Sequence, residues 1–357
     1  MKLLLAGGGT GGHLFPAVAL AQRLLATDSK AQVQFVGTAK GIEARVLPQL
    51  GLPLETIDIS GFVGKGWVGK LALAPQLVTS LRQSLRILDR FRPDVVVGVG
   101  GYASGPVLLA AKWRRIPTLI HEQNASPGLT NRLLGGWVDR VCLSFSEADC
   151  AFHRGRTVLT GNPLRPGMDD CPAPPGSQPT LLVFGGSRGA RAINEAMVAA
   201  LPQLQQLQPL RIIHQSGSED LERVRQGYQA AGWENAEIVP FIEDMAAAYA
   251  QAHLVICRAG ATTLAELTAC GRPAILIPYP HAAADHQTAN ARALARKGAG
   301  LLLAQTELSG ERLARLAGDL LQDRDRLGTM AAAARMLAKK GAADLILQEC
   351  RIIAGGK

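Results

Sequence analysis

The sequence predicts an α/β protein of two domains, each built on a parallel sheet. Short apolar runs alternate with helical patterns along all 357 residues. Near the start, the apolar run Leu3–Ala6 leads into the glycine-rich turn Gly7–His13. In the second half, Leu181–Phe184 leads into Gly185–Arg191 in the same way. Such turns bring backbone N–H groups close to a ligand at a helix start, so we expect two nucleotide-type domains with a site in or near their cleft.

The apolar runs and periodic segments define the expected elements. Strands are expected at 2–6, 32–37, 54–59, 95–99, 118–121, 140–144 and 157–159, and then at 180–184, 211–215, 237–240, 254–257, 274–277 and 300–303. The clearest helices are expected at 16–26, 76–90, 190–208 and 307–322.

The linker between the domains is expected at Asp169–Gln178, which holds three prolines and shows no periodicity. We place the domain switch near Gly161–Pro163, so that the domains cover 1–162 and 163–340. A last amphipathic helix, within 341–357, is expected to return to the first domain.

Composition narrows the class of protein. Apolar residues make up 47% of the chain, which is enough for large cores, and no run approaches the roughly 20 apolar residues of a membrane span. No signal peptide is recognisable, so a cytoplasmic protein is expected. The six cysteines are scattered without metal-ligand spacing, so we expect reduced thiols and no zinc.

The excess positive charge lies in the first half of the chain. Residues 1–162 hold 18 Lys and Arg against 10 Asp and Glu, whereas residues 163–357 hold 20 against 19. The few Tyr and Trp do not interleave with Arg as base-stacking residues would, so nucleic acid is not expected as a partner. An anionic membrane face or a phosphorylated lipid fits this charge.

The first glycine turn argues against a nicotinamide enzyme and is either a ligand-binding turn or a tight turn without a ligand. Its Gly7-x-Gly9-x-x-Gly12 spacing fits the dinucleotide fingerprint, but the second expected strand ends at Thr38 without the ribose-binding carboxylate. His13 stands at the mouth of the first helix, where it either takes a proton from a hydroxyl nucleophile or only hydrogen-bonds a phosphate or a neighbouring loop.

Two further motifs follow strands of the first half. Gly98–Pro106 is a glycine-rich loop suited to an acceptor pyrophosphate. The sequence His121–Asn124 places polar side chains at a strand end, with Glu122 as a second candidate base and Asn124 as a ligand to substrate hydroxyls. Arg165, at the expected hinge, either reaches a phosphate or is a plain surface residue.

In the second half, Ser187 and the N–H groups around Gly189 suit a diphosphate. Glu266, within the first turns of a helix, either binds both ribose hydroxyls of a nucleotide or only complements the helix dipole. Gln287 is a candidate for sugar hydroxyls. We interpret the sequence Asp323-Arg324-Asp325 as solvated surface, and we expect no metal site.

Aromatic and basic residues gather in two segments of the first half. One is Gly64–Leu73, with Trp67 and Lys70, and the other is Lys112–Arg115. Between them, helix 76–90 carries leucines on one face and arginines off it. This composition is typical of a membrane-surface patch, although the leucine stripe also fits ordinary core packing.

Taken together, the motifs resemble the MurG family of bacterial N-acetylglucosaminyltransferases over essentially the whole chain. They are GGGTGGHLFPA at 7–17, GVGGYASGP at 98–106, HEQN at 121–124, GNPLR at 161–165, GGSRGAR at 185–191 and CRAGATTLAE at 257–266. The resemblance implies a GT-B fold, with two Rossmann-like domains whose parallel sheets face each other across a cleft. It implies inverting transfer of GlcNAc from UDP-GlcNAc to the C4 hydroxyl of MurNAc in undecaprenyl-pyrophosphoryl-MurNAc-pentapeptide, which converts lipid I to lipid II in peptidoglycan synthesis.

The resemblance also implies the site residues. The donor UDP-GlcNAc would be bound by Thr10, Gly11, Gly12, Asn124, Arg165, Ser187, Ile242, Ala261, Thr262, Thr263, Leu264, Ala265, Glu266 and Gln287. The acceptor diphosphate would be bound by Gly9, His13, Gly100, Gly101, Tyr102 and Ser104, with His13 or Glu122 as the base and with no cofactor or obligatory metal. A peripheral location on the cytoplasmic face of the cell membrane, contact with its anionic inner leaflet, and partners in cell-wall synthesis and division are further implications.

The sequence departs from the family pattern at two positions, where Arg188 and His286 stand in place of glutamines common in the family. Two other functions remain open at this point. One is a UDP-GlcNAc 2-epimerase of the same fold, and the other is a non-catalytic sensor of nucleotide sugars.

Overall fold

The structure is a computed structural model that describes residues 1–60, 73–153, 155–165, 167–176, 178–233 and 236–355. Its contacts divide the chain into two compact units. Unit 1 comprises Met1–Arg165 with Gly341–Lys357, and unit 2 comprises Pro166–Lys340. The division thus falls three residues after the boundary expected at 162/163.

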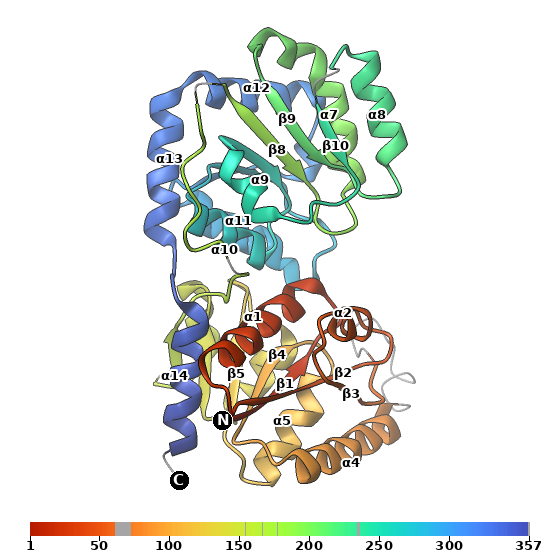
Figure 1. Ribbon diagram of the computed structural model, residues 1–357, viewed down its shortest axis with the longest axis vertical. Coiled ribbons are helices and arrows are strands. Elements are labelled where there is room, and N and C mark those ends of the chain that lie inside the picture. The colour runs from red at the N-terminus through yellow and green to blue at the C-terminus, as the bar shows by residue number, and fades with distance from the viewer. Residues whose placement is uncertain (61–72, 154, 166, 177, 234–235, 356–357) are drawn as a thin grey trace. The chain divides into compact units, whose positions relative to one another are not determined.

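Unit 1 is built on a parallel sheet in the order β3-β2-β1-β4-β5-β6-β7 (Figure 1). Its strands are β1 (Lys2–Gly7), β2 (Gln32–Gly37), β3 (Leu54–Thr56), β4 (Val95–Gly100), β5 (Thr118–Glu122), β6 (Arg140–Leu143) and β7 (Thr157–Leu159). Its α-helices are α1 (Gly11–Thr27), α2 (Glu43–Gln49), α4 (Leu73–Phe91), α5 (Ser104–Trp113), α6 (Leu129–Leu134) and α14 (Ala342–Gly355).

Both faces of the central part of this sheet are buried, which explains why strands such as β1 and β4 contain continuous apolar runs. Along β1, Leu3 and Leu5 join one core with residues of α1 and α14, whereas Leu4 and Ala6 join a second core on the other face. Strands solvated on one face would alternate polar and apolar residues instead.

The last helix, α14, packs onto unit 1 as the sequence led us to expect. Ile346 and Leu347 are buried in the core that contains α1. Asp344 forms a two-point ion pair with Arg23, at 2.7 and 2.9 Å, and Arg140 pairs with Glu349 at 2.8 Å. The two ends of the chain therefore stabilise the same unit.

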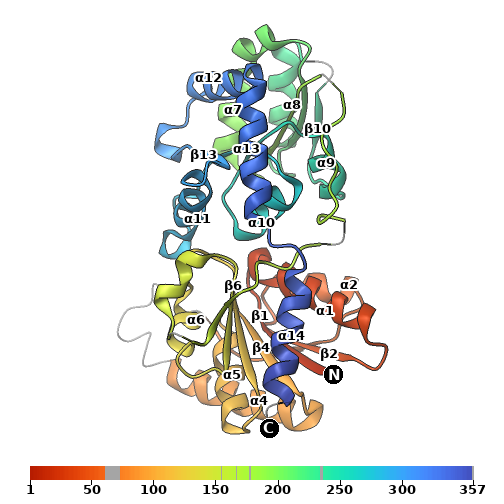
Figure 2. The same ribbon diagram turned by 90° about the vertical axis from the view of Figure 1, so that its left-hand side faces the viewer.

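Unit 2 is built on a second parallel sheet, in the order β10-β9-β8-β11-β12-β13 (Figure 2). Its strands are β8 (Thr180–Phe184), β9 (Arg211–Gln215), β10 (Glu237–Val239), β11 (Leu254–Cys257), β12 (Ala274–Leu276) and β13 (Gly300–Leu302). Its α-helices are α7 (Arg191–Leu204), α8 (Leu221–Ala230), α9 (Met245–Gln251), α10 (Ala261–Cys270), α11 (His286–Ala295), α12 (Gly310–Gln322) and α13 (Arg324–Leu337).

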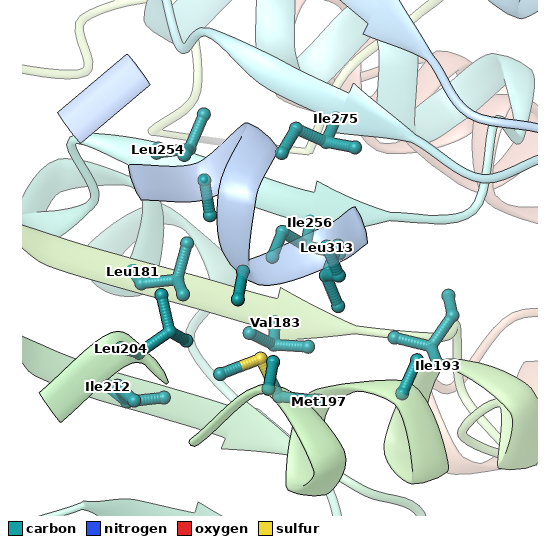
Figure 3. Packing of buried hydrophobic residues seen from close by; sticks show 14 of the residues in the cluster. Leu181, Val183, Ile193, Met197, Leu204, Ile212, Leu254, Ile256, Ile275 and Leu313 are labelled. Atoms are coloured by element: carbon teal, nitrogen blue, oxygen red, sulfur yellow. The ribbon is translucent and has the colours of Figure 1, made fainter. Parts of the chain in front are cut away.

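Figure 3 shows the core on one face of this second sheet. Strand residues such as Val183 and Ile256 pack against Ile193 and Met197 of α7 and against Leu313 of α12. These side chains are fully buried, so the two helices are fixed against the sheet by close packing.

The predicted α/β class is confirmed, and the differences lie at element ends. Helix α1 begins at Gly11 rather than at residue 16, so Pro16 lies inside the helix. Proline removes the N–H that would reach the carbonyl of Gly12, but Gly12 is exposed and water can satisfy that carbonyl. Helix α12 begins at Gly310 rather than at 307, because the Ser309 side chain caps it by accepting the N–H of Arg312.

Candidate functional site

In unit 1, two glycine turns meet at the carboxyl ends of the neighbouring strands β1 and β4. The N–H of Gly8 donates to the carbonyl of Gly100 at 3.3 Å. A Cβ atom at Gly7 would lie 2.3 Å from the oxygen of Gly100, and one at Gly101 would lie 2.5 Å from the oxygen of Gly8. Gly7, Gly8, Gly100 and Gly101 all have positive φ angles, so only glycine allows the two turns to approach this closely.

Helix N-termini open directly after both turns. Helix α1 begins at Gly11 and α5 begins at Ser104, and the residues Thr10, Gly12 and Tyr102 are exposed. Neighbouring helix N-termini with exposed glycine backbone favour a negatively charged ligand. Ser104 itself is buried, with its hydroxyl against Gly98, so its contact with a diphosphate would come from the backbone N–H.

Glu43, which the sequence analysis did not single out, supports the first glycine turn. Its buried carboxylate accepts the N–H of Gly9 at 2.8 Å and the N–H and hydroxyl of Thr38 at 2.9 and 3.0 Å. A Cβ atom on any of three surrounding glycines would come within 2.5 Å of this side chain; they are Gly8, Gly37 and Gly41. Gly37 and Gly41 shortly precede Glu43 in the sequence, whereas Gly8 is brought to it by the fold.

His13 lies between the two turns. Its Nδ1 is 3.3 Å from the carbonyl oxygen of Gly8 and 3.4 Å from the hydroxyl of Thr10. A Cβ atom at Gly100 would lie 3.1 Å from Nε2, so that edge of the ring faces the second turn. A proton on Nδ1, donated to Gly8, places the basic lone pair on Nε2.

Glu122 is buried and holds the loop that follows β5. One carboxylate oxygen accepts the N–H of Asn124 at 2.9 Å, and the other accepts the side chain of Asn131 at 2.8 Å and the N–H of Gly128 at 3.1 Å. Both oxygens are therefore engaged within the protein. Asn131, which sequence analysis missed, ties Glu122 to α6.

Three other predicted polar residues of unit 1 are His121 and Asn124, at the end of β5, and Arg165. His121 is buried, and its Nε2 is 3.1 Å from the carbonyl oxygen of Gly161. Burial lowers the pKa of His121 to about 4, so the ring is neutral near pH 7. Asn124 is half-buried, and the guanidinium of Arg165 lies over the ring of Phe15.

Unit 2 holds a pocket of about 660 Å³ at the carboxyl ends of β8 and β11. The first residues of α7, Arg191 and Ala192, line it, together with Gly260, which caps α10. Two helix N-termini therefore open onto one pocket, as a diphosphate would require. Thr263 and Gln287 are the predicted donor ligands that line it.

Arg258 lines the same pocket, although the sequence analysis gave it no role. Its guanidinium donates to the carbonyls of Ile277 and Pro278 and, at 2.7 Å, to Gln305, and it lies over the ring of Tyr279. Burial lowers the pKa of this group. None of these acceptors carries a charge, so the positive charge of Arg258 is available to an anion in the pocket.

The other predicted donor residues of unit 2 are not part of the lining of this pocket, and they differ in burial. Glu266 is buried, and one of its oxygens accepts the hydroxyl of Tyr249 at 3.1 Å. Ala261 and Leu264 are buried, whereas Thr262, Ala265 and Ile242 are half-buried and Ser187 is exposed. Any contact of Leu264 with a donor therefore uses its backbone.

The loop that carries Ser187 is fixed by a second loop. A Cβ atom at Gly189 would lie 2.0 Å from the oxygen of Ser216, and one at Gly217 would lie 2.1 Å from the oxygen of Arg188. Asn194 donates to Ser216 at 2.9 Å and accepts from buried His214, whose Nε2 is 3.0 Å from the Asn194 oxygen. This buried pair fixes the second loop.

The most exposed large apolar side chains among the described residues of unit 1 lie at the end of α5 and on or just after α6. Trp113, at the end of α5, is 70% exposed. Leu129 and Leu133 of α6 and the following Trp137 are spaced by four residues and are 49%, 66% and 65% exposed. We call these three residues the α6 stripe. Sequence analysis missed it because the helix is short.

The leucine stripe expected on α4 is mainly core packing. Leu88 is buried, Leu81 and Leu85 pack against the same core, and Leu77 is the one of the four that is exposed. The segment with Trp67 and Lys70 lies outside the described residues. Within the part of the chain that the structure describes, no helix is long and apolar enough to span a bilayer.

Among the described residues, no three His, Cys, Asp or Glu side chains gather in a way that could hold a metal ion. The carboxylate of Asp323 in the Asp323-Arg324-Asp325 sequence caps α13 by accepting the N–H of Arg326 at 2.9 Å.

Comparison with known proteins decides the family. The N-terminal domain of glycosyltransferase family 28 matches residues 3–143, and the C-terminal domain of that family matches residues 180–348. A protein of Syntrophotalea carbinolica, named UDP-N-acetylglucosamine--N-acetylmuramyl-(pentapeptide) pyrophosphoryl-undecaprenol N-acetylglucosamine transferase, is 68% identical over 99% of both chains. This chain belongs to glycosyltransferase family 28.

Solved structures agree with this membership. The crystal structure of Acinetobacter baumannii MurG is 36% identical, covers 98% of this chain and 99% of its own, and superposes with a TM-score of 0.81. The resemblance to the MurG family and the GT-B fold class are thereby confirmed. A putative UDP-N-acetylglucosamine 2-epimerase from Listeria monocytogenes, 14% identical with 97% and 94% coverage and a TM-score of 0.63, shares the fold alone.

Two buried histidines predict that the family 28 protein loses stability in acid. Burial lowers the pKa of His121 to about 4 and that of His214 to about 3, whereas the unfolded chain keeps the ordinary value of 6.5. Below pH 6.5 each of these rings is protonated in the unfolded state. In the folded state the same ring is protonated only near its lower pKa. The free energy of unfolding therefore falls as the pH drops through this window, by about 1.4 kcal/mol per pH unit for each histidine.

We expect His214→Gln to reduce the slope of the free energy of unfolding against pH, measured by urea unfolding between pH 6.5 and about pH 5. The reduction should correspond to about one proton fewer taken up on unfolding. His281→Gln, at an exposed histidine of the same unit, is the control and should leave the slope unchanged. Equal slopes for the parent and His214→Gln would contradict the assignment.

Proposed function

We propose that this chain transfers GlcNAc from UDP-GlcNAc to the C4 hydroxyl of MurNAc in undecaprenyl-pyrophosphoryl-MurNAc-pentapeptide, with inversion at the anomeric carbon. The observation that carries the proposal is the 68% identity, over nearly the whole of both chains, to a relative named for this transfer. Helix N-termini that follow glycine turns in each unit support the proposal, because the reaction has two diphosphate substrates.

The donor is assigned to the pocket of unit 2. The N-termini of α7 and α10 meet the diphosphate, and Arg258 adds a full positive charge. Thr263 and Gln287 line the pocket and bind phosphate and sugar groups. Glu266, oriented by the hydroxyl of Tyr249, accepts ribose hydroxyls through its carboxylate. The leaving UDP is thus stabilised by groups already in place before reaction.

The acceptor is assigned to the paired glycine turns of unit 1. Its diphosphate is bound by the backbone N–H group of Gly101 and by the N-termini of α1 and α5. The expected contact of Gly9 does not use its N–H, because that group donates to Glu43. Thr10, Gly11, Gly12, Asn124 and Arg165, which are expected as ligands of the donor, belong to the same unit as this acceptor site. Glu43 orients the first turn through the N–H of Gly9.

His13 is the general base in this proposal. The C4 hydroxyl oxygen attacks the anomeric carbon, the bond from that carbon to the phosphate oxygen breaks, and UDP leaves with the bonding electrons. The hydroxyl proton passes to Nε2 of His13, which the Nδ1 contact with Gly8 leaves as the basic nitrogen. Glu122 is the weaker candidate, because both of its oxygens accept hydrogen bonds within the protein.

The chain is proposed to bind the membrane surface peripherally, through unit 1. Trp113 and the α6 stripe present exposed apolar side chains, and α6 follows the loop that Glu122 holds beside the acceptor turns. Arg114, Arg115 and Arg132 lie beside these side chains in sequence and add positive charge for anionic lipids. This arrangement brings a polyprenyl-linked diphosphate to the site from the bilayer.

The reaction is tested by UDP release with a short-chain analogue of the lipid acceptor. We expect His13→Ala to lower turnover by about 10²–10⁴-fold with UDP affinity unchanged, since it removes only proton transfer. Gln287→Ala should raise the KM for the donor and change turnover little. His153→Ala, at an exposed histidine of unit 1, is the control and should change neither.

The same assay separates the rival functions. Conversion of UDP-GlcNAc to ManNAc and UDP without acceptor would assign the epimerase reaction. Tight donor binding without turnover in the presence of the acceptor analogue would assign a sensor. Normal turnover in His13→Ala would remove His13 as the base while leaving the transfer itself intact.

Membrane binding is tested by sedimentation with vesicles of anionic and of neutral lipid. Replacing Leu133 and Trp137 by serine should weaken binding to anionic vesicles by about tenfold or more, because each buried apolar side chain contributes about 1.5–3 kcal/mol. Met336→Ser, at an exposed apolar residue of unit 2, is the matched control. Unchanged binding of the double variant would show that the α6 stripe is not the contact surface.

A further inference from the structure

A second pocket of unit 2 lies at the opposite ends of the strands from the proposed donor site. It has a volume of about 410 Å³ and is bounded by Pro179, before β8, by His253, before β11, and by Pro273, before β12. Helix α13, which crosses in front of the sheet of unit 2 in Figure 2, forms its outer wall. The volume is within the range of small-molecule sites, which begins at about 300 Å³.

The pocket combines an apolar surface with concentrated positive charge. Leu321, Leu327 and Ala331 supply apolar surface. The charged groups of its lining are three arginines, Arg272, Arg324 and Arg335, and the lining among the described residues includes no Asp or Glu. A small molecule in this pocket would therefore meet hydrocarbon on one side and guanidinium groups on the other.

Arg272 is the most unusual of these residues. It is 1% exposed, and its hydrogen bonds go to the carbonyls of Tyr249 and Pro172 and to the Sγ of Cys171. None of the salt bridges among the described residues includes it. A buried charge without an opposite charge is costly, so burial lowers the pKa of Arg272, and the charge of Arg335 lowers it further.

The side chain of Arg335 reaches the pocket over Gly271, the glycine that ends α10. Gly271 ends α10 with a φ angle of 61°, and a Cβ atom there would lie 2.4 Å from Nε of Arg335. The arginine side chain therefore lies directly over this glycine. His253 is half-buried beside it, and its Nδ1 accepts the N–H of Thr180 at 3.1 Å. Burial, followed by the charges of Arg272 and Arg324, lowers the pKa of His253, so the arginines supply the positive charge near pH 7.

We propose that this pocket binds a small organic phosphate, a phosphate monoester with an apolar group, whose phosphate meets Arg272 and Arg335 and whose apolar group lies against Leu327 and Ala331. A phosphate monoester carries a charge of about −1.5 to −2 near pH 7, so it balances the charge of several guanidinium groups better than a carboxylate does. The apolar group uses the hydrocarbon surface that an inorganic ion would leave unfilled.

The test is calorimetric titration of the full chain with hexyl phosphate in the presence of saturating UDP. The comparison ligands are inorganic phosphate, hexanoate and hexanol. We expect hexyl phosphate to bind at least about tenfold more tightly than any of the three, since each lacks either the apolar group or the double charge.

Arg335→Gln should weaken hexyl phosphate binding by about tenfold, whereas Arg326→Gln, at another exposed arginine of α13 that does not line the pocket, should leave it unchanged. Arg335 is exposed and its removal leaves Arg272 intact, so the variant should fold normally. Absence of hexyl phosphate binding, or equal binding by Arg335→Gln and the parent, would overturn the proposal. Weakening by Arg258→Gln in place of Arg335→Gln would overturn it too, by assigning the ligand to the donor pocket.

Discussion

Both proposed diphosphate sites depend on one constraint, the approach of two backbone segments closer than any side chain allows. In unit 1, Gly7 and Gly101 face the carbonyls of Gly100 and Gly8, where a Cβ atom would lie within 2.5 Å of an oxygen. In unit 2, Gly189 and Gly217 face the carbonyls of Ser216 and Arg188 in the same reciprocal way, at 2.0 and 2.1 Å. Because neighbouring parallel strands end side by side, the turns that follow them meet, and glycine lets them lock together.

Buried polar side chains fix these turns in place through hydrogen bonds to their backbone. Glu43 holds the first turn through Gly9, and Asn194 with His214 holds the loop of Ser216. Each of these groups is buried and hydrogen-bonded, so moving a turn would leave a buried polar group without its partner. The exposed N–H groups at the helix starts are therefore fixed in direction before a ligand arrives. This preorganisation is what electrostatic stabilisation of a leaving diphosphate requires.

Sequence reasoning found the strands because parallel strands buried on both faces are continuous apolar runs, as β4 and β8 illustrate. It found the glycine turns because nothing but glycine fits there. It missed Glu43, whose role depends on a chain reversal between β2 and α2 that no local pattern encodes. It also missed the α6 stripe, because six helical residues are too few to show a period. Glu122 looked available in sequence, and only the fold showed its oxygens engaged.

The locked glycine pair of unit 2 can be tested by calorimetric UDP titration of Gly189→Ala. A methyl group there must displace the Ser216 carbonyl and the donor loop, so the account predicts a loss of UDP affinity of about tenfold or more, with the folded content unchanged by circular dichroism. Gly318→Ala, on helix α12, where the new Cβ would lie 3.7 Å from Leu207, should bind UDP as the parent does. Equal affinity of Gly189→Ala and the parent would contradict the claim that close backbone approach builds the site.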